Sequence, residues 1–288
     1  MTTIHQALEQ ATLSLTQASQ TNARLDAQVL LSHALQVERS FLYAFPEHVL
    51  TPDQEQHYQT LIERRSRGEP IAYLTGHKEF YGLDFLVDKR VLIPRPETEL
   101  LVEAALNACK KMFDVGRAPI VADIGTGSGA IPVTLAVFEP RLPYLYASDI
   151  STDALDVASL NCLRHHVEDR VRLLHGDLLA PLPEPVDILT ANLPYVGIDE
   201  LEELTLDIRA YEPHLALFSG PLGLDLMLRF FQELKRSQKL KEGAMLLFEI
   251  GYRQREALTS ILQEIWPHAI LTFTKDFAGW NRVLQVTL

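Results

Sequence analysis

Three glycines at alternate positions, Gly125, Gly127 and Gly129, follow an apolar run at residues 120–124. The residues after them, to about residue 138, have the composition of a helix. Glycines between a strand and a helix let the backbone pass close to a ligand, and the start of the helix presents unpaired N–H groups. The pattern predicts a cofactor-binding loop, made by Gly125, Thr126, Gly127, Ser128 and Gly129.

An acidic residue, Asp149, ends the next apolar run, about twenty residues further on. A carboxylate at this position accepts hydrogen bonds from ribose hydroxyls, so the two features together indicate a cofactor that contains adenosine. They do not separate a nicotinamide dinucleotide from S-adenosylmethionine, and a tight turn followed by a capping Asp is the purely structural alternative. Asp177 and Leu178, which follow a third run at residues 171–174, are weaker candidates for contact with an adenine edge.

The segment Asn192-Leu193-Pro194-Tyr195 follows a fourth run, at residues 186–191. A planar amino group that is to be methylated needs acceptors for its N–H bonds and an aromatic wall beside its plane. The Asn192 side-chain carbonyl and the Leu193 backbone carbonyl would supply the acceptors, and Tyr195 the wall. Such acceptors would aim the nitrogen at a methyl sulfonium, which is catalysis by positioning. An ordinary Asn-x-Pro turn after a strand is the alternative.

Elements that alternate between strand and helix must position these residues. Runs that predict strands lie at residues 120–124, 144–148, 171–174, 186–191, 245–250, 270–274 and 282–286. Helical segments separate most of them, which is typical of a mostly parallel sheet with helices on both faces. The last two runs have no helix between them, so we expect an antiparallel hairpin at the sheet edge. The carboxyl ends of the strands would bring the glycine loop and the Asn192–Tyr195 segment to one rim.

The first seventy-odd residues differ in character, because their apolar positions recur every three or four residues, as on one face of a helix. Thr51, Pro52 and Gln54 predict the start of a helix that has a capping box and a proline in its first turn. Gly76 and Gly82 then interrupt a segment rich in apolar and aromatic residues, which predicts a β-hairpin. We expect a helical domain at residues 1–74, a β-hairpin linker at 75–95 and an α/β domain at 96–288.

Composition narrows the class of protein. The 288 residues carry 26 Lys and Arg against 38 Asp and Glu, a net charge of −12, so a nucleic acid is not the expected partner. No run reaches the ~18 apolar residues that a membrane span needs, and the first residues do not have the pattern of a secretory signal. We therefore expect a cytoplasmic protein with Cys109 and Cys162 as buried thiols. The histidines show no metal-ligand spacing, so we expect no metal site.

The sequence resembles the bacterial protein-(glutamine-N5) methyltransferases that modify peptide-chain release factors. The resemblance covers nearly the whole chain. Its motifs are Gly68-x-Pro70-x-x-Tyr73-x-x-Gly76, Leu92-Ile93-Pro94-Arg95-Pro96-Glu97-Thr98-Glu99, Asp123-Ile124-Gly125-Thr126-Gly127-Ser128-Gly129, Tyr211-Glu212-Pro213, Glu249-Ile250-Gly251 and Asp276-x-Ala278-Gly279-x-x-Arg282. The Pro-Arg-Pro-Glu-Thr-Glu segment is the most specific, since the glycine loop belongs to many methyltransferases.

The resemblance implies a class I, Rossmann-like methyltransferase sheet, with the small helical domain for substrate recognition. It implies S-adenosylmethionine as cofactor, held by the glycine loop, Asp149, Leu178 and Asn192. The substrate would be the glutamine of the Gly-Gly-Gln motif of a release factor, bound by Asn192, Leu193, Pro194 and Tyr195. The alternatives are an adenine-N6 methyltransferase of nucleic acids and a catalytically weak S-adenosylmethionine-binding protein. The second arises because Leu193 stands where the family has the first proline of Asn-Pro-Pro-Tyr, which removes a fixed φ angle.

Overall fold

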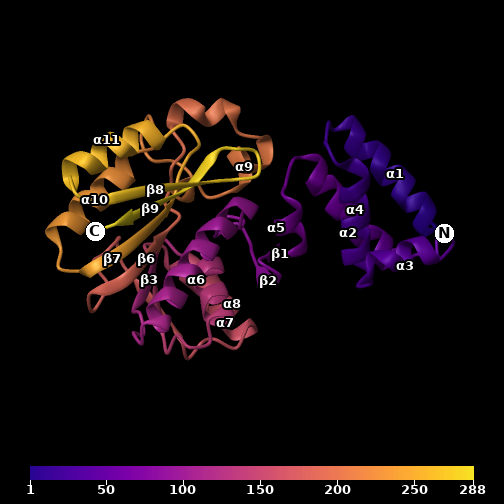
Figure 1. The fold of residues 1–288 in the computed structure, drawn as a ribbon. Coiled ribbons are helices and arrows are strands. Elements are labelled where there is room, and N and C mark those ends of the chain that lie inside the picture. Colours follow the sequence, from indigo (N-terminus) through magenta and orange to yellow (C-terminus); the bar gives the residue numbers. More distant parts are fainter. The chain divides into compact units, whose positions relative to one another are not determined.

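The computed structural model describes every residue from Met1 to Leu288 and divides the chain into two compact units (Figure 1). One unit consists of residues 1–77 together with 205–211, and the other of residues 78–204 together with 212–288. The chain therefore passes from one unit to the other three times. No helix is both long and apolar enough to cross a bilayer.

The helical unit contains α1 (Ile4–Gln17), α2 (Ala23–Leu35), α3 (Arg39–Ala44), α4 (Pro52–Ser66), α5 (Ile71–Thr75) and α9 (Leu206–Tyr211). Its core is formed mainly by buried leucines and alanines of α1, α2 and α4. The predicted capping box is confirmed: the Thr51 hydroxyl accepts from Gln54 N–H, and the Gln54 side chain accepts from Thr51 N–H. The six-residue α3 and five-residue α5 are too short for a periodic pattern to reveal them.

The helix α9 packs against the end of α4, although about 140 residues separate them in sequence. Gly68 has a φ of +97°, which strains any residue with a side chain, and a Cβ atom there would lie 2.9 Å from Leu206 Cδ2, so the leucine would have to shift. The Tyr211 hydroxyl donates to the Arg67 carbonyl oxygen at 3.1 Å. The sequence pattern predicts that these seven residues belong to the α/β domain at 96–288, whereas their contacts place them in the helical unit.

The larger unit is built on a seven-stranded sheet in the order β5-β4-β3-β6-β7-β9-β8. Its strands are β3 (Val121–Ile124), β4 (Leu145–Asp149), β5 (Val171–His175), β6 (Val186–Ala191), β7 (Leu240–Glu249), β8 (Ile270–Lys275) and β9 (Asn281–Thr287). The first five are parallel, while β9 runs antiparallel to both of its neighbours. The expected edge hairpin of β8 and β9 is confirmed. The strand order reverses at β3, and this is where such sheets bind ligands.

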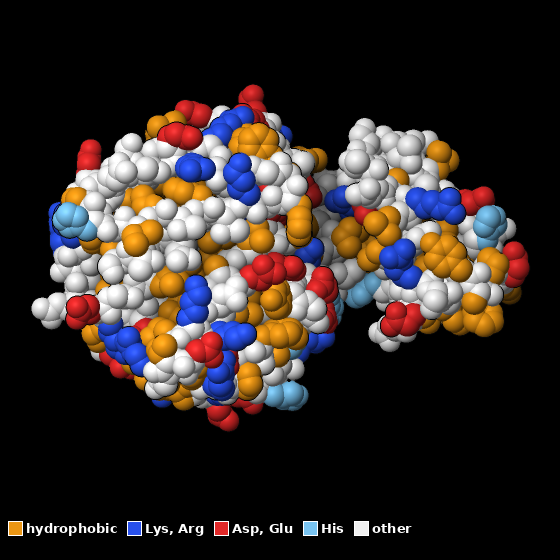
Figure 2. All heavy atoms as spheres, viewed as in Figure 1, with side chains coloured by type: hydrophobic (Ala, Val, Ile, Leu, Met, Phe, Trp, Pro, Cys, Tyr) orange, Lys and Arg blue, Asp and Glu red, His pale blue; other side chains and the backbone are white.

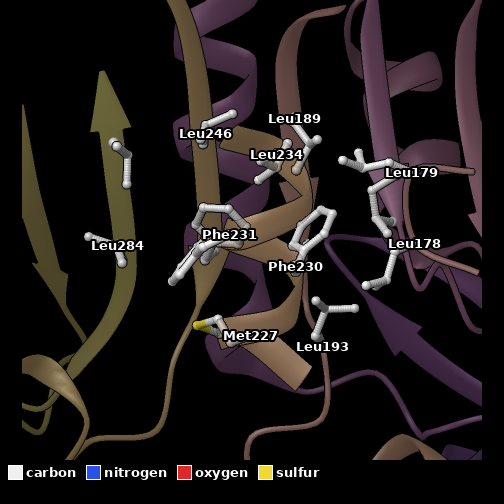
Figure 3. Packing of buried hydrophobic residues seen from close by; sticks show 14 of the residues in the cluster. Leu178, Leu179, Leu189, Leu193, Met227, Phe230, Phe231, Leu234, Leu246 and Leu284 are labelled. Atoms are coloured by element: carbon white, nitrogen blue, oxygen red, sulfur yellow. The ribbon is translucent and has the colours of Figure 1, made fainter. Parts of the chain in front are cut away.

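Helices cover both faces of this sheet. In Figure 1, α10 (Asp225–Arg236) and α11 (Arg255–Ile265) lie over one face, and α6 (Glu99–Asp114), α7 (Ala130–Phe138) and α8 (Thr152–Arg164) over the other. Every residue of β3 and β6 is buried, as expected for central strands covered on both sides. Figure 3 shows Phe230, Phe231 and Leu234 of α10 packed onto the sheet. Short 3₁₀ turns lie at Pro96–Thr98, Ile198–Glu203 and His214–Ala216.

The predicted hairpin forms from β1 (His77–Phe80) and β2 (Leu83–Leu86), and α8 holds it in place. Asn161, which is fully buried, accepts from Leu86 N–H at 2.7 Å and donates to the Leu86 carbonyl at 2.9 Å. The same amide donates to the Ser128 carbonyl at 2.9 Å. One side chain thus joins the hairpin to the glycine loop. The two cysteines are buried and free, as predicted.

Candidate active site

A cavity of about 350 Å³ opens at the carboxyl ends of β3, β4 and β6. It brings together ten of the residues singled out in the sequence: Gly125, Thr126, Gly127, Ser128, Asp149, Asp177, Leu178, Asn192, Leu193 and Pro194. The remaining two, Gly129 and Tyr195, are not part of its lining. Thr98, from the Pro-Arg-Pro-Glu-Thr-Glu segment, lines the cavity as well.

The glycine loop takes a conformation that other residues adopt rarely. Gly125, Gly127 and Gly129 have φ angles of +72°, +55° and +78°. A Cβ atom on Gly127 would meet nothing within 4 Å, so this glycine serves the turn itself. A Cβ atom on Gly129 would come within 3.2 Å of Ala158, so this glycine lets α7 begin close against α8. The loop therefore brings backbone to the cavity and starts a helix directly behind it.

Asp149 ends β4 and holds the loop. Its Oδ2 accepts from Gly127 N–H at 2.8 Å, and its Oδ1 accepts from Ser151 N–H at 2.9 Å. An ionised carboxylate has about four acceptor positions, so two are left for hydroxyl groups of a ligand. Asp149 would thus have two functions, to shape the glycine loop and to bind a ribose.

Leu178 adopts a φ of +45°, which is uncommon for a residue with a side chain. The strain is compatible with a backbone turned toward a ligand. Its neighbour Asp177 is paired with Arg229 at 2.5 Å, and both lie at the wall of the cavity. The Asp177 carboxylate therefore already has a partner, which leaves Leu178 the better candidate for contact with an adenine.

Asn192 lines the cavity from the end of β6, and its Nδ2 donates to Thr98 Oγ1 at 3.3 Å. Tyr195 is not part of the cavity lining, and its hydroxyl donates to Glu249 Oε1 at 3.0 Å. The role of Tyr195 as an aromatic wall remains a prediction. Burial raises the pKa of Tyr195 well above its ordinary value, so the phenol stays protonated and remains a hydrogen-bond donor.

The residues of the site fit S-adenosylmethionine in one respect that the sequence did not reveal. Asp123, fully buried at the carboxyl half of β3, accepts from Thr190 Oγ1 at 2.7 Å. Its other oxygen, Oδ2, makes no hydrogen bond of ordinary geometry, although the nearby Thr126 hydroxyl lowers the pKa of the carboxyl group. Ser148 Oγ, at the same end of β4, is also unpaired. Buried polar atoms without partners are rare, and here they lie beside the glycine loop. Asp123 does not line the cavity itself, but its carboxylate would offset the positive charge of a methionine ammonium group bound at the neighbouring glycine loop.

Affinity for S-adenosylmethionine is expected to increase as the pH rises from 5 to 7. Burial raises the pKa of Asp123 to about 6, against an ordinary value of 3.8. A raised pKa means that the carboxyl group is protonated below pH 6, when it cannot pair with an ammonium group. At pH 5 roughly one molecule in ten carries the charge, so binding should be about tenfold weaker than at pH 7.

Calorimetric titration between pH 5 and 7 checks this expectation. Asp123→Asn should bind weakly at pH 7 and show little dependence on pH. If the unmodified protein binds equally well at both ends of this range, Asp123 does not face the ammonium group.

Leu193 is 3% exposed, and its side chain reaches the glycine loop. A Cβ atom on Gly125 would lie 3.0 Å from Leu193 Cδ2. Figure 3 shows Leu193 in the apolar cluster with Leu178, Met227 and Phe230. The residue at the unusual position of the Asn-x-Pro-Tyr segment is therefore part of the core, which explains how the turn keeps its place without the first proline.

Leu193→Pro should retain or increase kcat, since a fixed φ would preorganise the backbone carbonyl. The proline ring buries about one methylene less than the leucine side chain, which lowers the free energy of unfolding by roughly 1 kcal/mol. The proline also restricts the unfolded chain, which raises the free energy of unfolding by a similar amount. The melting temperature should therefore change little. Leu193→Ala, which removes packing without fixing φ, is the matched control and should lower both kcat and the melting temperature. A clear loss of activity in a folded Leu193→Pro variant would mean that this turn depends on the leucine.

Comparison with known proteins agrees with this geometry. A family model described as "PrmC N-terminal domain" matches residues 6–76, and one described as "Methyltransferase small domain" matches residues 98–206. The release factor glutamine methyltransferase of Koribacter versatilis is 40% identical over 285 residues, 98% of this chain and 97% of that protein. The one from Moorella thermoacetica is 41% identical over 281 residues, 97% and 96% of the two chains.

Solved structures share the fold at low identity. A methyltransferase from Pyrococcus furiosus has a TM-score of 0.50 at 17% identity, over 80% of this chain and 96% of that one. The hMettl16 catalytic domain, in complex with the MAT2A 3'UTR hairpin 1, has a TM-score of 0.55 at 14% identity, over 85% and 84%. At such identities the likeness concerns the fold alone.

The sheet order and the cavity at its switch point, together with the matched methyltransferase model, define a class I methyltransferase that uses S-adenosylmethionine. A nicotinamide dinucleotide is no longer an alternative. Given relatives of 40% and 41% identity over nearly the full length, the chain belongs to the family of release factor glutamine methyltransferases.

Three contributors to the site were missed or underestimated from the sequence. Asp123, Glu249 and Thr98 appear in the sequence analysis only as members of family motifs. A charged residue at the end of an apolar run is a signal that could have found the first two, since β3 is fully buried and Glu249 ends the buried half of β7. The pairing of Thr98 with Glu249 spans 151 positions and has no local signal.

Proposed function

We propose that this chain transfers a methyl group from S-adenosylmethionine to the side-chain amide nitrogen of the glutamine in the Gly-Gly-Gln motif of peptide-chain release factors. The observation that carries the proposal is the position of Asn192 in the wall of the cavity, next to the glycine loop. The names of the relatives support the choice of substrate. We also propose that the protein acts in the cytoplasm, where such factors work.

The bound cofactor supplies an electrophilic methyl group on a sulfonium. The glycine loop, Asp149, Leu178 and Asp123 would hold it, through backbone, ribose, adenine and ammonium contacts respectively. The Asn192 side-chain carbonyl and the Leu193 backbone carbonyl would accept the two N–H bonds of the glutamine amide. These bonds fix the plane of the amide and increase electron density on its nitrogen. The protein would therefore act by orientation, with the apolar walls of the cavity keeping water away.

The helical unit has no part in the cavity, so we propose that it recognises the protein that carries the glutamine. Contacts remote from the reacting atom can supply orientation for the reaction. If so, the KM for an intact release factor should be far below that for a short Gly-Gly-Gln peptide.

Incubation with radiolabelled S-adenosylmethionine tests the proposal. An intact release factor should take up label at the Gly-Gly-Gln glutamine, and a factor with Gly-Gly-Ala in its place should take up none. Label on a DNA or RNA oligonucleotide under the same conditions would favour the adenine-N6 alternative instead. The net charge of −12 speaks against that outcome. On the face drawn in Figure 2, acidic side chains are interspersed among the basic ones.

A further inference from the structure

A buried carboxylate, Glu249, lies at the carboxyl end of β7 and is 1% exposed. Its Oε2 accepts from Thr98 Oγ1 at 2.6 Å, and its Oε1 accepts from the Tyr195 hydroxyl at 3.0 Å. Burial raises the pKa of Glu249, and the hydroxyls of Thr98 and Tyr195 oppose that rise. As a carboxylate, Glu249 can only accept hydrogen bonds.

The direction of the Thr98 hydroxyl follows from this. A threonine hydroxyl has a single hydrogen to donate, and here Glu249 receives it. The Thr98 oxygen is then left as an acceptor, and Asn192 Nδ2 donates to it at 3.3 Å. Thr98 is 4% exposed, so little water competes for this position.

The same argument fixes the orientation of the Asn192 amide. Its two ends, Nδ2 and Oδ1, are of similar size and exchange places on a half turn about the last side-chain bond. One hydrogen of Nδ2 is bound to Thr98, and Oδ1 accepts no hydrogen bond within the protein, so Oδ1 is free to accept from a group in the cavity. Oδ1 accepts and does not donate, so it suits a substrate that brings N–H bonds.

We propose that Glu249, acting through Thr98, locks the Asn192 amide with its oxygen toward the substrate and thereby makes the site select an amide over a carboxylate. This inference rests on the proposed function, because it concerns how the same site recognises a glutamine. Glu249 and Thr98 are positioning residues. A glutamate in place of the glutamine would turn a carboxylate oxygen toward Asn192 Oδ1 and be repelled.

Removing the Thr98 hydroxyl removes the hydrogen bond that fixes the orientation of the Asn192 amide. In Thr98→Val the Asn192 amide can turn, and its Nδ2 can then donate to a substrate carboxylate. Discrimination between glutamine and glutamate should therefore weaken, beyond any general loss of rate. Thr98→Ser keeps the hydroxyl and should keep the discrimination. A merely structural role for Thr98 would lower stability or kcat and leave the discrimination unchanged.

The test measures binding of two forms of a release factor, one with Gly-Gly-Gln and one with Gly-Gly-Glu, at pH 8 with S-adenosylhomocysteine bound. The ratio of their Kd values is expected to fall by about tenfold in Thr98→Val, because one hydrogen bond to a charged group is gained. It should stay within about twofold of the unmodified protein in Thr98→Ser. Thr134→Val is the matched control, since Thr134 is buried and its hydroxyl bonds only to Ala130 O of its own helix.

An unchanged ratio in Thr98→Val, or an equal change in Thr134→Val, would overturn the inference. If Thr98→Val does not fold, Thr98→Ala removes the same hydroxyl and gives the same comparison. Methylation of the Gly-Gly-Gln factor by the unmodified protein is measured in parallel. Absence of methylation would refute the proposed function. Methylation together with an unchanged ratio of Kd values in Thr98→Val would refute only the orientation of the Asn192 amide by Glu249 and Thr98.

Discussion

Asn192→Ala should lower kcat for release factor methylation by roughly 100-fold or more, because it removes an acceptor aimed at the reacting nitrogen. Affinity for S-adenosylmethionine should stay within a few-fold, since the glycine loop and Asp149 remain in place. The expected pattern is that of an interaction used mainly in the transition state. Single-turnover kinetics and calorimetry on the same preparation measure the two quantities.

Asn107→Ala, on the exposed side of α6, is the matched control and should behave as the unmodified protein. Two results would count against the assignment of Asn192. One is a kcat within threefold of normal, and the other is a loss of cofactor binding as large as the loss of rate.

Asp149→Ala should weaken S-adenosylmethionine binding by about 2–3 kcal/mol, or roughly 30- to 150-fold, because charged hydrogen bonds to the ribose are lost. The structure adds a second reason, since Asp149 also accepts from Gly127 N–H and Ser151 N–H. Asp149→Asn keeps one side-chain oxygen, so it should bind more tightly than Asp149→Ala. Calorimetry gives the affinities, with circular dichroism as the check of folding.

Asp153→Ala, one turn further on and exposed, is the control for removal of a negative charge nearby. Unchanged affinity in a folded Asp149→Ala variant would show that the ribose lies elsewhere. Equal losses in Asp149→Ala and Asp153→Ala would point to a general charge effect.

Much of the fold follows from local sequence, because periodicity and turn residues are local. The strand runs and the glycine loop are examples, as is the capping box at Thr51. The longer elements are predicted correctly, but the structure gives some of them other bounds. The strand β7 begins at Leu240, before Gly243, whereas the apolar run that predicts it begins only at Met245. The segment between Tyr195 and Leu224 shows no clear period, and the structure divides it into two 3₁₀ turns and the short α9.

The site was predictable where chemistry follows a strand end and not where it depends on contacts across the fold. Asn192 and Asp149 end buried strands, so their place on one rim follows from a parallel sheet. The link from Glu249 through Thr98 to Asn192 joins three distant segments, and no pattern in the chain encodes it. The unpaired oxygen of Asp123 likewise becomes evident only when all neighbours are in place.

The position of α9 affects how the protein is completed during synthesis. The helical unit includes residues 205–211, yet residues 1–77 leave the ribosome first. At about 5–20 residues per second, the missing helix follows roughly 6 to 26 seconds later. During that interval Gly68 and the Arg67 carbonyl have no partner from α9. The surface of the nascent helical unit on which α9 packs would thus stay uncovered until α9 is synthesised. By then, four strands of the catalytic sheet, β3 to β6, have already been made.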